Sequence, residues 1–319
     1  MAARVFIEKE AKQLPADAFP RVYTRSARAA LRHILRARLI HDPRGILLPA
    51  YVGLSPKEGS GVLDPVKEAG ASFDFYEVSE RLVPDLEDLE RKLATGRFQL
   101  ALLIHYFGCP QIDAGDFVRR CRRHHVQVVE DCAHTLLGGL GGERLGAKGA
   151  FAIFSIHKST WLPEGGFFYD HHDQLSRTSL ADREALDRPS LEAFSRLDLV
   201  SAAQRRRRLY DLVASWVLEL PGLELFFPKV PANAVPLNCP VIVANGKREP
   251  LYFQLIERGI QPTALYHTLI PELGADRYPK AHQIARNILN LPTHPDILDA
   301  HLDAYRGALR ASVQEVLRT

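Results

Sequence analysis

Short apolar runs alternate with amphipathic, charged stretches from Gly45 to about Asp170. This pattern is typical of the strands and crossover helices of an α/β sheet. Between two such runs, PDLEDLERKLA (84–94) predicts a helix, because a proline and acidic residues stand at its start and its leucines share one face. The expected strands are GILLPAY (45–51), ASFDFYEV (71–78), QLALLIHYFG (99–108), VQVVED (126–131), GAFAIFSI (149–156) and GGFFYD (165–170).

A second, smaller unit is expected after a long connecting helix at about 197–220, which a break at Pro221 and Gly222 ends. It holds a strand at NCPVIVA, a helix around EPLYFQLIERGI and a closing helix after Asp299. At 319 residues the chain exceeds the size at which one hydrophobic core stops growing. We therefore expect a large domain (1–200), a connecting helix (201–225) and a small C-terminal domain (226–319).

Charge and composition are ordinary for a globular protein, with a net charge of only +3. This excess is too small to indicate a nucleic-acid partner. The densest basic run, Arg205 to Arg208, fits a solvated helix face, a phosphate or nucleotide contact, or nonspecific nucleic-acid binding.

The cysteines are scattered without metal or disulfide spacing, which favours reduced thiols in the cytoplasm. Cys121, His124 and His125 resemble a metal site, but FVRRCRRHH is typical of an amphipathic helix, so we expect no metal. The N-terminal residues lack the apolar core of a signal peptide, and no stretch is apolar enough to span a membrane. We expect a cytoplasmic protein without a membrane partner.

Asp131 and Lys158 stand at or just past the ends of two expected strands. Ligands of open α/β sheets gather at such ends, where Tyr51 and His105 also fall. A lysine amine and a carboxylate are the groups that pyridoxal phosphate requires, for its aldehyde and its pyridine nitrogen respectively. Each residue alone also fits a simpler interpretation: a strand-end Asp that caps a turn, and a lysine on a solvated loop.

The stretch VVEDCAHTLLGGLGGERLGAKGAFAIFSIHKSTWLPEGG resembles the core of the DegT/DnrJ/StrS family of pyridoxal-phosphate sugar aminotransferases. SARAAL, LLPAY, IHYFGCPQ and NILNLPTHPDI resemble other family blocks in the same order, so the resemblance covers about Thr24 to Ile297. It implies an aspartate-aminotransferase-like α/β fold (PLP fold type I): a mostly parallel seven-stranded sheet, a small α+β C-terminal domain and a homodimer.

The resemblance also assigns roles to residues of this chain. It implies that Lys158 forms the internal aldimine, that Asp131 pairs with the pyridinium nitrogen and that Ala133 packs on the ring. His134 stands near the phenolic oxygen of the ring. For the phosphate it implies Ser155 and the turn Ser26, Ala27 and Arg28, where backbone N–H groups open a helix.

Two positions depart from the family pattern. Gly53 stands where the family commonly has an aromatic residue stacked on the ring, and Tyr51 is a possible substitute. Leu209 stands where the family has an asparagine that reaches the phosphate of the neighbouring subunit, unless an arginine of the adjoining run takes that role.

The implied function is transfer of an amino group from glutamate or glutamine to a nucleotide-linked keto sugar, through a pyridoxamine intermediate, in sugar or polysaccharide biosynthesis. Tyr266, His267 and Arg205 to Arg208 are polar candidates for contact with the sugar nucleotide. Two alternatives stay open: a sugar dehydratase, in which His157 would take the lysine position, and a catalytically silent or regulatory cofactor binder. A nicotinamide-binding protein is less consistent, because GGLGGERLG lacks GxGxxG spacing after a first strand.

Overall fold

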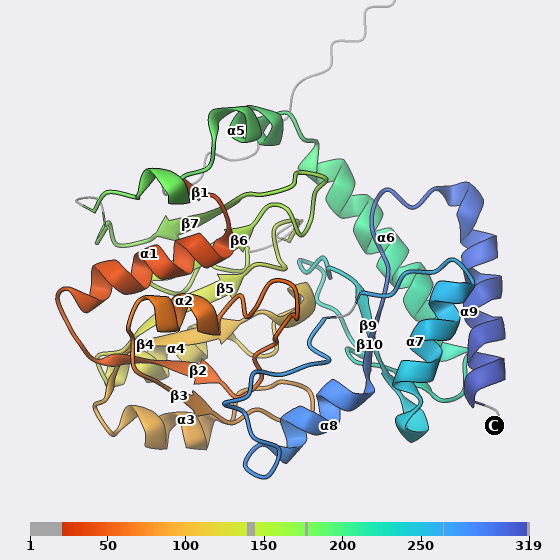
Figure 1. Ribbon diagram of the computed structural model, residues 1–319, viewed down its shortest axis with the longest axis horizontal. Helices are drawn as coiled ribbons and strands as arrows, with labels where there is room; N and C mark the ends of the chain where they lie inside the picture. Colours follow the sequence, from red (N-terminus) through yellow and green to blue (C-terminus); the bar gives the residue numbers. More distant parts are fainter. Residues whose placement is uncertain (1–20, 139–143, 176–177, 264, 318–319) are drawn as a thin grey trace, which may run out of the picture.

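The large part of the protein is built on one seven-stranded sheet (Figure 1). The structure is a computed structural model that describes residues 21–138, 144–175, 178–263 and 265–317. The strand order of the sheet is β1-β7-β6-β5-β4-β2-β3. β7 alone runs antiparallel to its neighbours in this sheet, which confirms the mostly parallel arrangement. The strands are β1 (Arg21–Thr24), β2 (Gly45–Pro49), β3 (Phe73–Tyr76), β4 (Phe98–Ile104), β5 (Gln127–Cys132), β6 (Phe151–Ser155) and β7 (Gly166–Asp170).

Helices cover both faces of the central strands. β2, β4 and β6 are buried at every position, as expected for parallel strands packed on two sides. The flanking helices are α1 (Ala27–Leu39), α2 (Leu63–Glu68), α3 (Leu86–Leu93), α4 (Ala114–Arg123) and α5 (Arg188–Ser195). The side chains between these layers form the main hydrophobic core.

The C-terminal part forms a second hydrophobic cluster around a three-stranded sheet of order β10-β9-β8. Figure 1 shows α6 running from the large sheet to this unit, where it lies near α7 and α9. The elements are α6 (Leu199–Leu218), β8 (Leu223–Leu225), β9 (Cys239–Val243), α7 (Arg248–Glu257), α8 (Pro279–Asn287), β10 (Ile288–Leu291) and α9 (Leu302–Leu317). The division at 200 and 225 stays a prediction; its first boundary falls inside α6.

Local details of the sequence interpretation need correction. Pro84 does not lie in α3, because Asp85 is the N-cap and its carboxylate accepts the N–H groups of Glu87 and Asp88. The N-terminal residues 1–20 and the centre of the glycine-rich stretch (139–143) lie outside the described residues.

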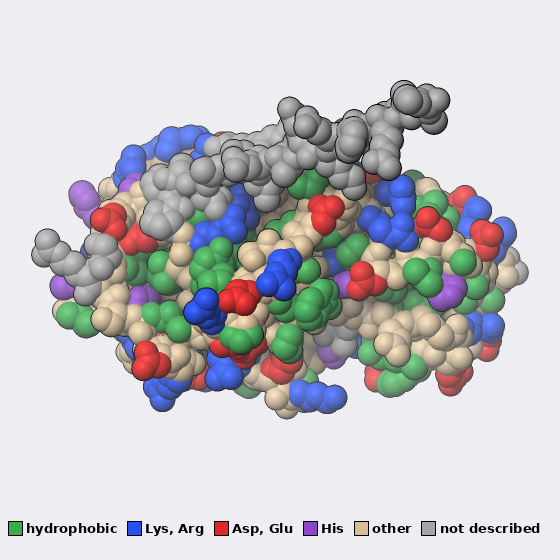
Figure 2. All heavy atoms as spheres, turned by 90° about the horizontal axis from the view of Figure 1, so that it is seen from above, with side chains coloured by type: hydrophobic (Ala, Val, Ile, Leu, Met, Phe, Trp, Pro, Cys, Tyr) green, Lys and Arg blue, Asp and Glu red, His purple; other side chains and the backbone are tan. Residues whose placement is uncertain are grey.

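The described surface carries charges of both signs. Figure 2 shows Lys and Arg side chains interspersed with Asp and Glu on one face of the molecule. Ion pairs such as Arg32 with Glu184 and Arg120 with Asp116 distribute these charges locally. None of the described helices combines the length and the apolar character that crossing a membrane requires.

Candidate active site

The predicted site residues meet at the carboxyl edge of the large sheet. Asp131 is the penultimate residue of β5, and Lys158 lies three residues beyond β6. His105 directly follows β4, and Tyr51 lies two residues beyond β2. Because β2, β4, β5 and β6 are parallel neighbours, their carboxyl ends bring these four residues to one edge.

Asp131 is a nearly buried carboxylate that lacks a cationic contact. Its side chain is only 7% exposed, and Oδ1 accepts the backbone N–H of Ala133 at 2.9 Å. Burial raises the pKa of Asp131, while the positive charge of Lys158 opposes this shift. No arginine or lysine among the described residues lies within ion-pair distance of it. The carboxylate is therefore available to a cationic N–H group of a ligand.

His134 and Lys158 contact each other beside this carboxylate. The Nδ1 of His134 accepts the backbone N–H of Phe107 at 3.2 Å, and its Nε2 lies 3.1 Å from the Nζ of Lys158. Burial, followed by the charge of Lys158, holds the pKa of His134 well below its usual range. The ring is therefore neutral, with its proton on Nε2. This N–H is a donor directed to the position of the lysine amine.

The amine of Lys158 contacts the His134 ring. The residue is exposed to solvent, yet protein surrounds the amine on the side of His134 and Asp131. This partial burial lowers the pKa of Lys158, whereas Asp131 and Glu58 oppose the shift and Arg28 adds to it. A lowered pKa increases the fraction of neutral amine, which is the nucleophilic form. Glu58 is exposed, and no feature of the sequence indicated its position near Lys158.

The amino end of α1 lies against Gly166 of β7. A Cβ on Gly166 would lie 2.5 Å from the N of Ala27 and 2.6 Å from the C of Ser26, so only glycine permits this approach. The hydroxyl of Ser26 caps the helix by accepting the N–H of Ala29 at 3.1 Å. The N–H groups of Ala27 and Arg28 precede it in the first turn, where a helix has no acceptors of its own. These groups and the helix dipole favour an anion.

Ser155 and Arg28 adjoin this helix end differently. Ser155 pairs with Gly166 across β6 and β7, but it is fully buried and its hydroxyl lies 3.3 Å from the Nδ1 of His157. Arg28 is half-buried and forms no ion pair with the described acidic residues. Its positive charge is a minor contribution to the lowered pKa of Lys158, after burial. Arg28 therefore lies within electrostatic reach of the site.

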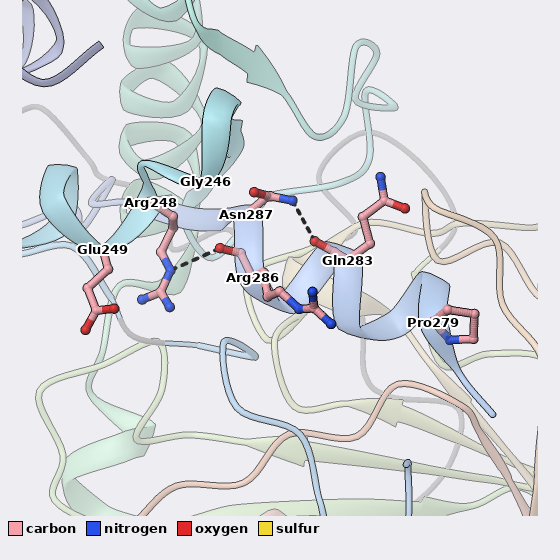
Figure 3. Close-up of a pocket in the computed structure, with 7 residues that line it drawn as sticks. All are labelled: Gly246, Arg248, Glu249, Pro279, Gln283, Arg286 and Asn287. Carbon is pink, nitrogen blue, oxygen red and sulfur yellow. Dashed lines mark hydrogen bonds between the residues drawn. The ribbon is translucent and has the colours of Figure 1, made fainter. Parts of the chain in front are cut away.

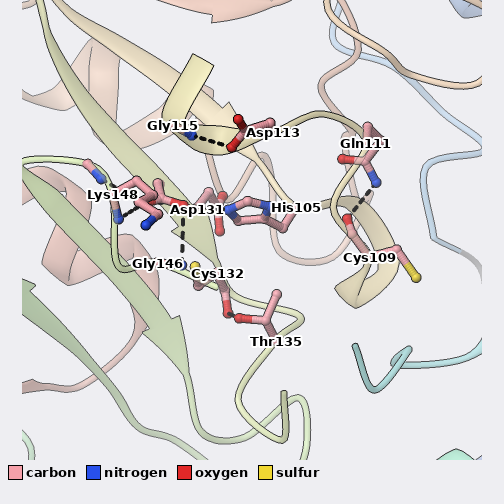
Figure 4. Close-up of polar contacts among 12 residues, drawn as sticks. His105, Cys109, Gln111, Asp113, Gly115, Asp131, Cys132, Thr135, Gly146 and Lys148 are labelled. Atoms are coloured by element: carbon pink, nitrogen blue, oxygen red, sulfur yellow. Dashed lines mark hydrogen bonds and ion pairs between the residues drawn. The ribbon is translucent and has the colours of Figure 1, made fainter. Parts of the chain in front are cut away.

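A buried contact between His105, just past β4, and Glu130 of β5 adjoins Asp131. The Nε2 of His105 lies 2.7 Å from Glu130, and both side chains are at most 1% exposed. Burial favours the protonated form of Glu130, but hydrogen bonds from His105 and the backbone outweigh it and lower its pKa. Around these residues (Figure 4), the backbone N–H groups of Gly146, Lys148 and Gly149 donate to Glu130. His105 thus holds the floor of the site and does not line it.

One group of described residues, His105, Glu130 and Cys132, brings three ligand atoms within 4.8 Å of one another. Burial raises the pKa of the Cys132 thiol well above its usual range, so it is not the thiolate that metals prefer. Together with the donors that already occupy Glu130, this makes the group structural. In the other metal-like group of the sequence, Cys121 is buried and His124 pairs with Glu90 at 2.8 Å.

The two departures from the family pattern have different surroundings. Tyr51 is fully buried, and its hydroxyl donates to the carbonyl of Tyr266 at 2.9 Å, so it presents no open face to a ligand. A side chain at Gly53 would meet the ring of Tyr266 at 2.9 Å. Leu209 is 1% exposed and packs in the protein interior.

The basic run on α6 is largely used inside the chain. Arg205 donates to the carbonyls of Pro295 and Ile297, and Arg206 is buried and donates to that of Leu237. Arg207 pairs with Asp211 and donates to backbone carbonyls at 230–234. Arg208 is 65% exposed and lies 3.9 Å from Asp299. These contacts tie α6 to the C-terminal loops.

Asp131, His134 and Lys158 do not line the cavities found in the C-terminal part. One of about 650 Å³ lies between α7 and α8 (Figure 3), and none of the predicted site residues lines it. Its polar side chains are partly satisfied locally, since Asn287 donates to the carbonyl of Gln283 at 2.9 Å. His267 lines a neighbouring cavity of about 330 Å³ with Tyr252 and Phe253. Cavity size alone does not locate the candidate chemistry.

Comparison with known proteins finds a family model and several relatives that this chain resembles. The family model for the DegT/DnrJ/EryC1/StrS aminotransferase family matches residues 24–181. The chain is 23% identical to a UDP-N-acetyl-3-dehydro-α-D-glucosamine 3-aminotransferase of Acidithiobacillus ferrooxidans, over 89% of this chain and 82% of that protein. It is 25% identical to a dTDP-4-dehydro-2,3,6-trideoxy-D-glucose 4-aminotransferase of Saccharopolyspora spinosa, over 98% of this chain and 89% of that protein. A solved Streptococcus pneumoniae protein, described in its PLP form, shares the fold with a TM-score of 0.75 at 18% identity, over 93% and 88%.

Proposed function

We propose that the chain is a pyridoxal-phosphate-dependent aminotransferase, because residues 24–181 match the model of the DegT/DnrJ/EryC1/StrS aminotransferase family. It moves an amino group from glutamate or glutamine to a nucleotide-linked keto sugar. The expectation of an aminotransferase family is confirmed; the roles of the individual residues and the choice of substrates are part of this proposal.

One observation carries the proposal: a nearly buried carboxylate, a neutral imidazole and a lysine in contact with that imidazole lie at one edge of the large sheet. No described arginine or lysine lies within ion-pair distance of Asp131, so its charge is available to a pyridinium N–H. His134 offers an N–H, which suits a phenolic oxygen. The donor set therefore fits pyridoxal phosphate, whose ring, when bound, withdraws electrons from a substrate carbon.

Each residue then has a defined task. Lys158 would hold the cofactor at its Nζ, and the same atom would accept and return a proton, which its lowered pKa permits. Asp131 keeps the ring nitrogen protonated, and Ala133 provides a small surface beside it. Ser26, Ala27 and Arg28 hold the phosphate at the amino end of α1, and Ser155 adjoins them.

The keto-sugar substrate rests on the relatives. Two of them are named for amination of nucleotide-linked keto sugars, one at carbon 3 and one at carbon 4. Since these two differ in both nucleotide and carbon, we propose the substrate class and not a particular sugar. A homodimer is proposed on the same resemblance, and a single species of twice the chain mass in light scattering would support it.

A cytoplasmic location is proposed as well. The described cysteines Cys109, Cys121, Cys132 and Cys239 are all free and buried, as suits a reducing compartment.

The alternatives rest on weaker observations. A dehydratase would need His157 in the place of Lys158, but the His157 ring is directed to Ser155 while Lys158 contacts His134. A silent or regulatory binder remains a second candidate function, because Gly53 and Leu209 depart from the family pattern.

The test is a titration of the purified protein with pyridoxal phosphate, followed by addition of glutamate or glutamine. We expect a visible absorption band that requires Lys158, is lost in Lys158→Ala and persists in Lys57→Ala, an exposed lysine outside the site. An amino donor should convert it to the pyridoxamine spectrum, and a nucleotide-linked keto sugar should restore it. A band that no donor changes would favour the silent binder, and the absence of a Lys158-dependent band would refute the proposal.

A further inference from the structure

The residues after β2 pair with a segment of the C-terminal part. Leu54 donates its backbone N–H to Thr268 at 2.9 Å, and Ile270 donates to Val52 at 3.1 Å. Gly53 stands between them and forms a bridge with Leu269. This pairing brings a distant part of the chain to the edge of the large sheet that holds Asp131.

Tyr266 occupies the space beside Gly53. A Cβ at Gly53 would lie 2.9 Å from Cδ1 and 3.4 Å from Cε1 of the Tyr266 ring. The Tyr266 backbone has φ of 60°, a conformation that is rare and costly for a bulky residue. The hydroxyl of Tyr51 bonds to its carbonyl at 2.9 Å and helps to hold it there.

The ring of Tyr266 faces the predicted site. Its centroid lies 5.9 Å from that of His134, at an interplanar angle of 69°. Burial is the larger cause of the raised pKa of Tyr266, and the charge of Asp131 adds to it, so the phenol lies within electrostatic reach of that carboxylate. Tyr51 and Tyr106, the neighbouring tyrosines, are at most 2% exposed, whereas Tyr266 is half-buried. Of these three residues, Tyr266 is the one that is not fully buried.

We propose that Tyr266 supplies the aromatic contact to the cofactor ring, in the place that a side chain at Gly53 would otherwise fill. This inference rests on the proposed function. Glycine at position 53 and an aromatic ring at position 266 then form one matched pair, because the two side chains exclude each other. Cofactor binding consequently also joins the C-terminal part to the large sheet.

The test is a double-mutant cycle read out as the dissociation constant for pyridoxal phosphate, from the Lys158-dependent absorption band or fluorescence quenching. Tyr266→Ala should weaken binding about tenfold, the effect of losing one aromatic contact. Tyr266→Phe should bind like the unchanged protein. Gly53→Phe alone should weaken binding because its Cβ meets the Tyr266 ring, whereas Gly53→Phe combined with Tyr266→Ala should restore affinity to within about threefold.

Two further variants separate contact from folding. Tyr252→Ala removes a tyrosine from α7, outside the site, and should leave the dissociation constant unchanged. Tyr266→Leu keeps apolar volume without an aromatic ring and should weaken binding as Tyr266→Ala does, even if the alanine variant is unstable.

The outcomes distinguish the two proposals. Wild-type-like affinity in Tyr266→Leu, or no restoration by the combined variant, would overturn the role of Tyr266 and leave the aminotransferase proposal intact. Absence of Lys158-dependent binding in the unchanged protein would overturn the proposed function and this inference with it.

Discussion

Replacement of Gly166 by alanine tests whether the close approach of β7 and α1 builds the phosphate site. The added Cβ would lie 2.5 Å, 2.6 Å and 2.7 Å from the N of Ala27, the C of Ser26 and the O of Phe154. All three are backbone atoms, so no side chain can turn aside. Ordinary contact begins at 3.4 Å, so relief requires a shift of about 0.9 Å (3.4 minus 2.5). Such overpacking costs about 1–3 kcal/mol, and the rigid surroundings place this case at the upper end.

The same shift should displace the first-turn N–H groups of α1. Inorganic phosphate and pyridoxal phosphate should therefore both bind more weakly to Gly166→Ala, whereas pyridoxal, which lacks the phosphate, should lose less affinity. Thermal unfolding measures the stability change, and competition titration measures the binding. The matched control is Gly274→Ala, since a Cβ there has no heavy atom within 4 Å and the residue does not require positive φ. Unchanged stability and phosphate affinity in Gly166→Ala would refute the reasoning.

Three further predictions concern stability. Below about pH 6.5 the free energy of unfolding should fall less steeply in His134→Gln than in the unchanged protein, by at most about 1.4 kcal/mol per pH unit. The reason is that the buried His134 ring stays neutral, while in the unfolded chain it takes up a proton. Urea unfolding across pH 5 to 7 measures this difference, and parallel stability curves for the two proteins would contradict it. Leu209→Asn should lower the free energy of unfolding by about 3 kcal/mol or more, because it places an amide in the core. It should not tighten the binding of pyridoxal phosphate, and tighter binding would contradict this account. Gly307 is exposed within α9, where alanine favours the helix more than glycine does. Gly307→Ala should therefore raise the free energy of unfolding by about 0.5–1 kcal/mol. A lowered midpoint in thermal unfolding would contradict the assignment of a helix at this position.

Much of the sheet could be predicted because its central strands are short, continuous apolar runs. β4 and β5 were expected at 99–108 and 126–131 and lie at Phe98–Ile104 and Gln127–Cys132. β1 was not expected, because RVYT is short, mostly polar and at the edge, and it becomes a strand only through pairing with β7. β8, with three residues, was missed for a similar reason.

In the candidate site, too, residues next to predicted strands could be placed from the sequence, whereas contacts between distant segments could not. Asp131 and Lys158 follow apolar strands directly, so their place at one edge can be inferred from topology. The contact between Gly53 and Tyr266 joins segments far apart in the chain, and no local pattern indicates it. The close approach of Gly166 to α1 likewise depends on a distance between two segments, which the periodicity of the sequence does not contain.

The most direct test of the account is to locate the lysine that bonds to the cofactor. The protein is incubated with pyridoxal phosphate, reduced with borohydride to fix the bond, digested and mapped by mass spectrometry. The account predicts the phosphopyridoxyl group on Lys158, at a ratio near one per chain, with none in Lys158→Ala. Modification spread over exposed lysines such as Lys57, or undiminished in Lys158→Ala, would contradict it.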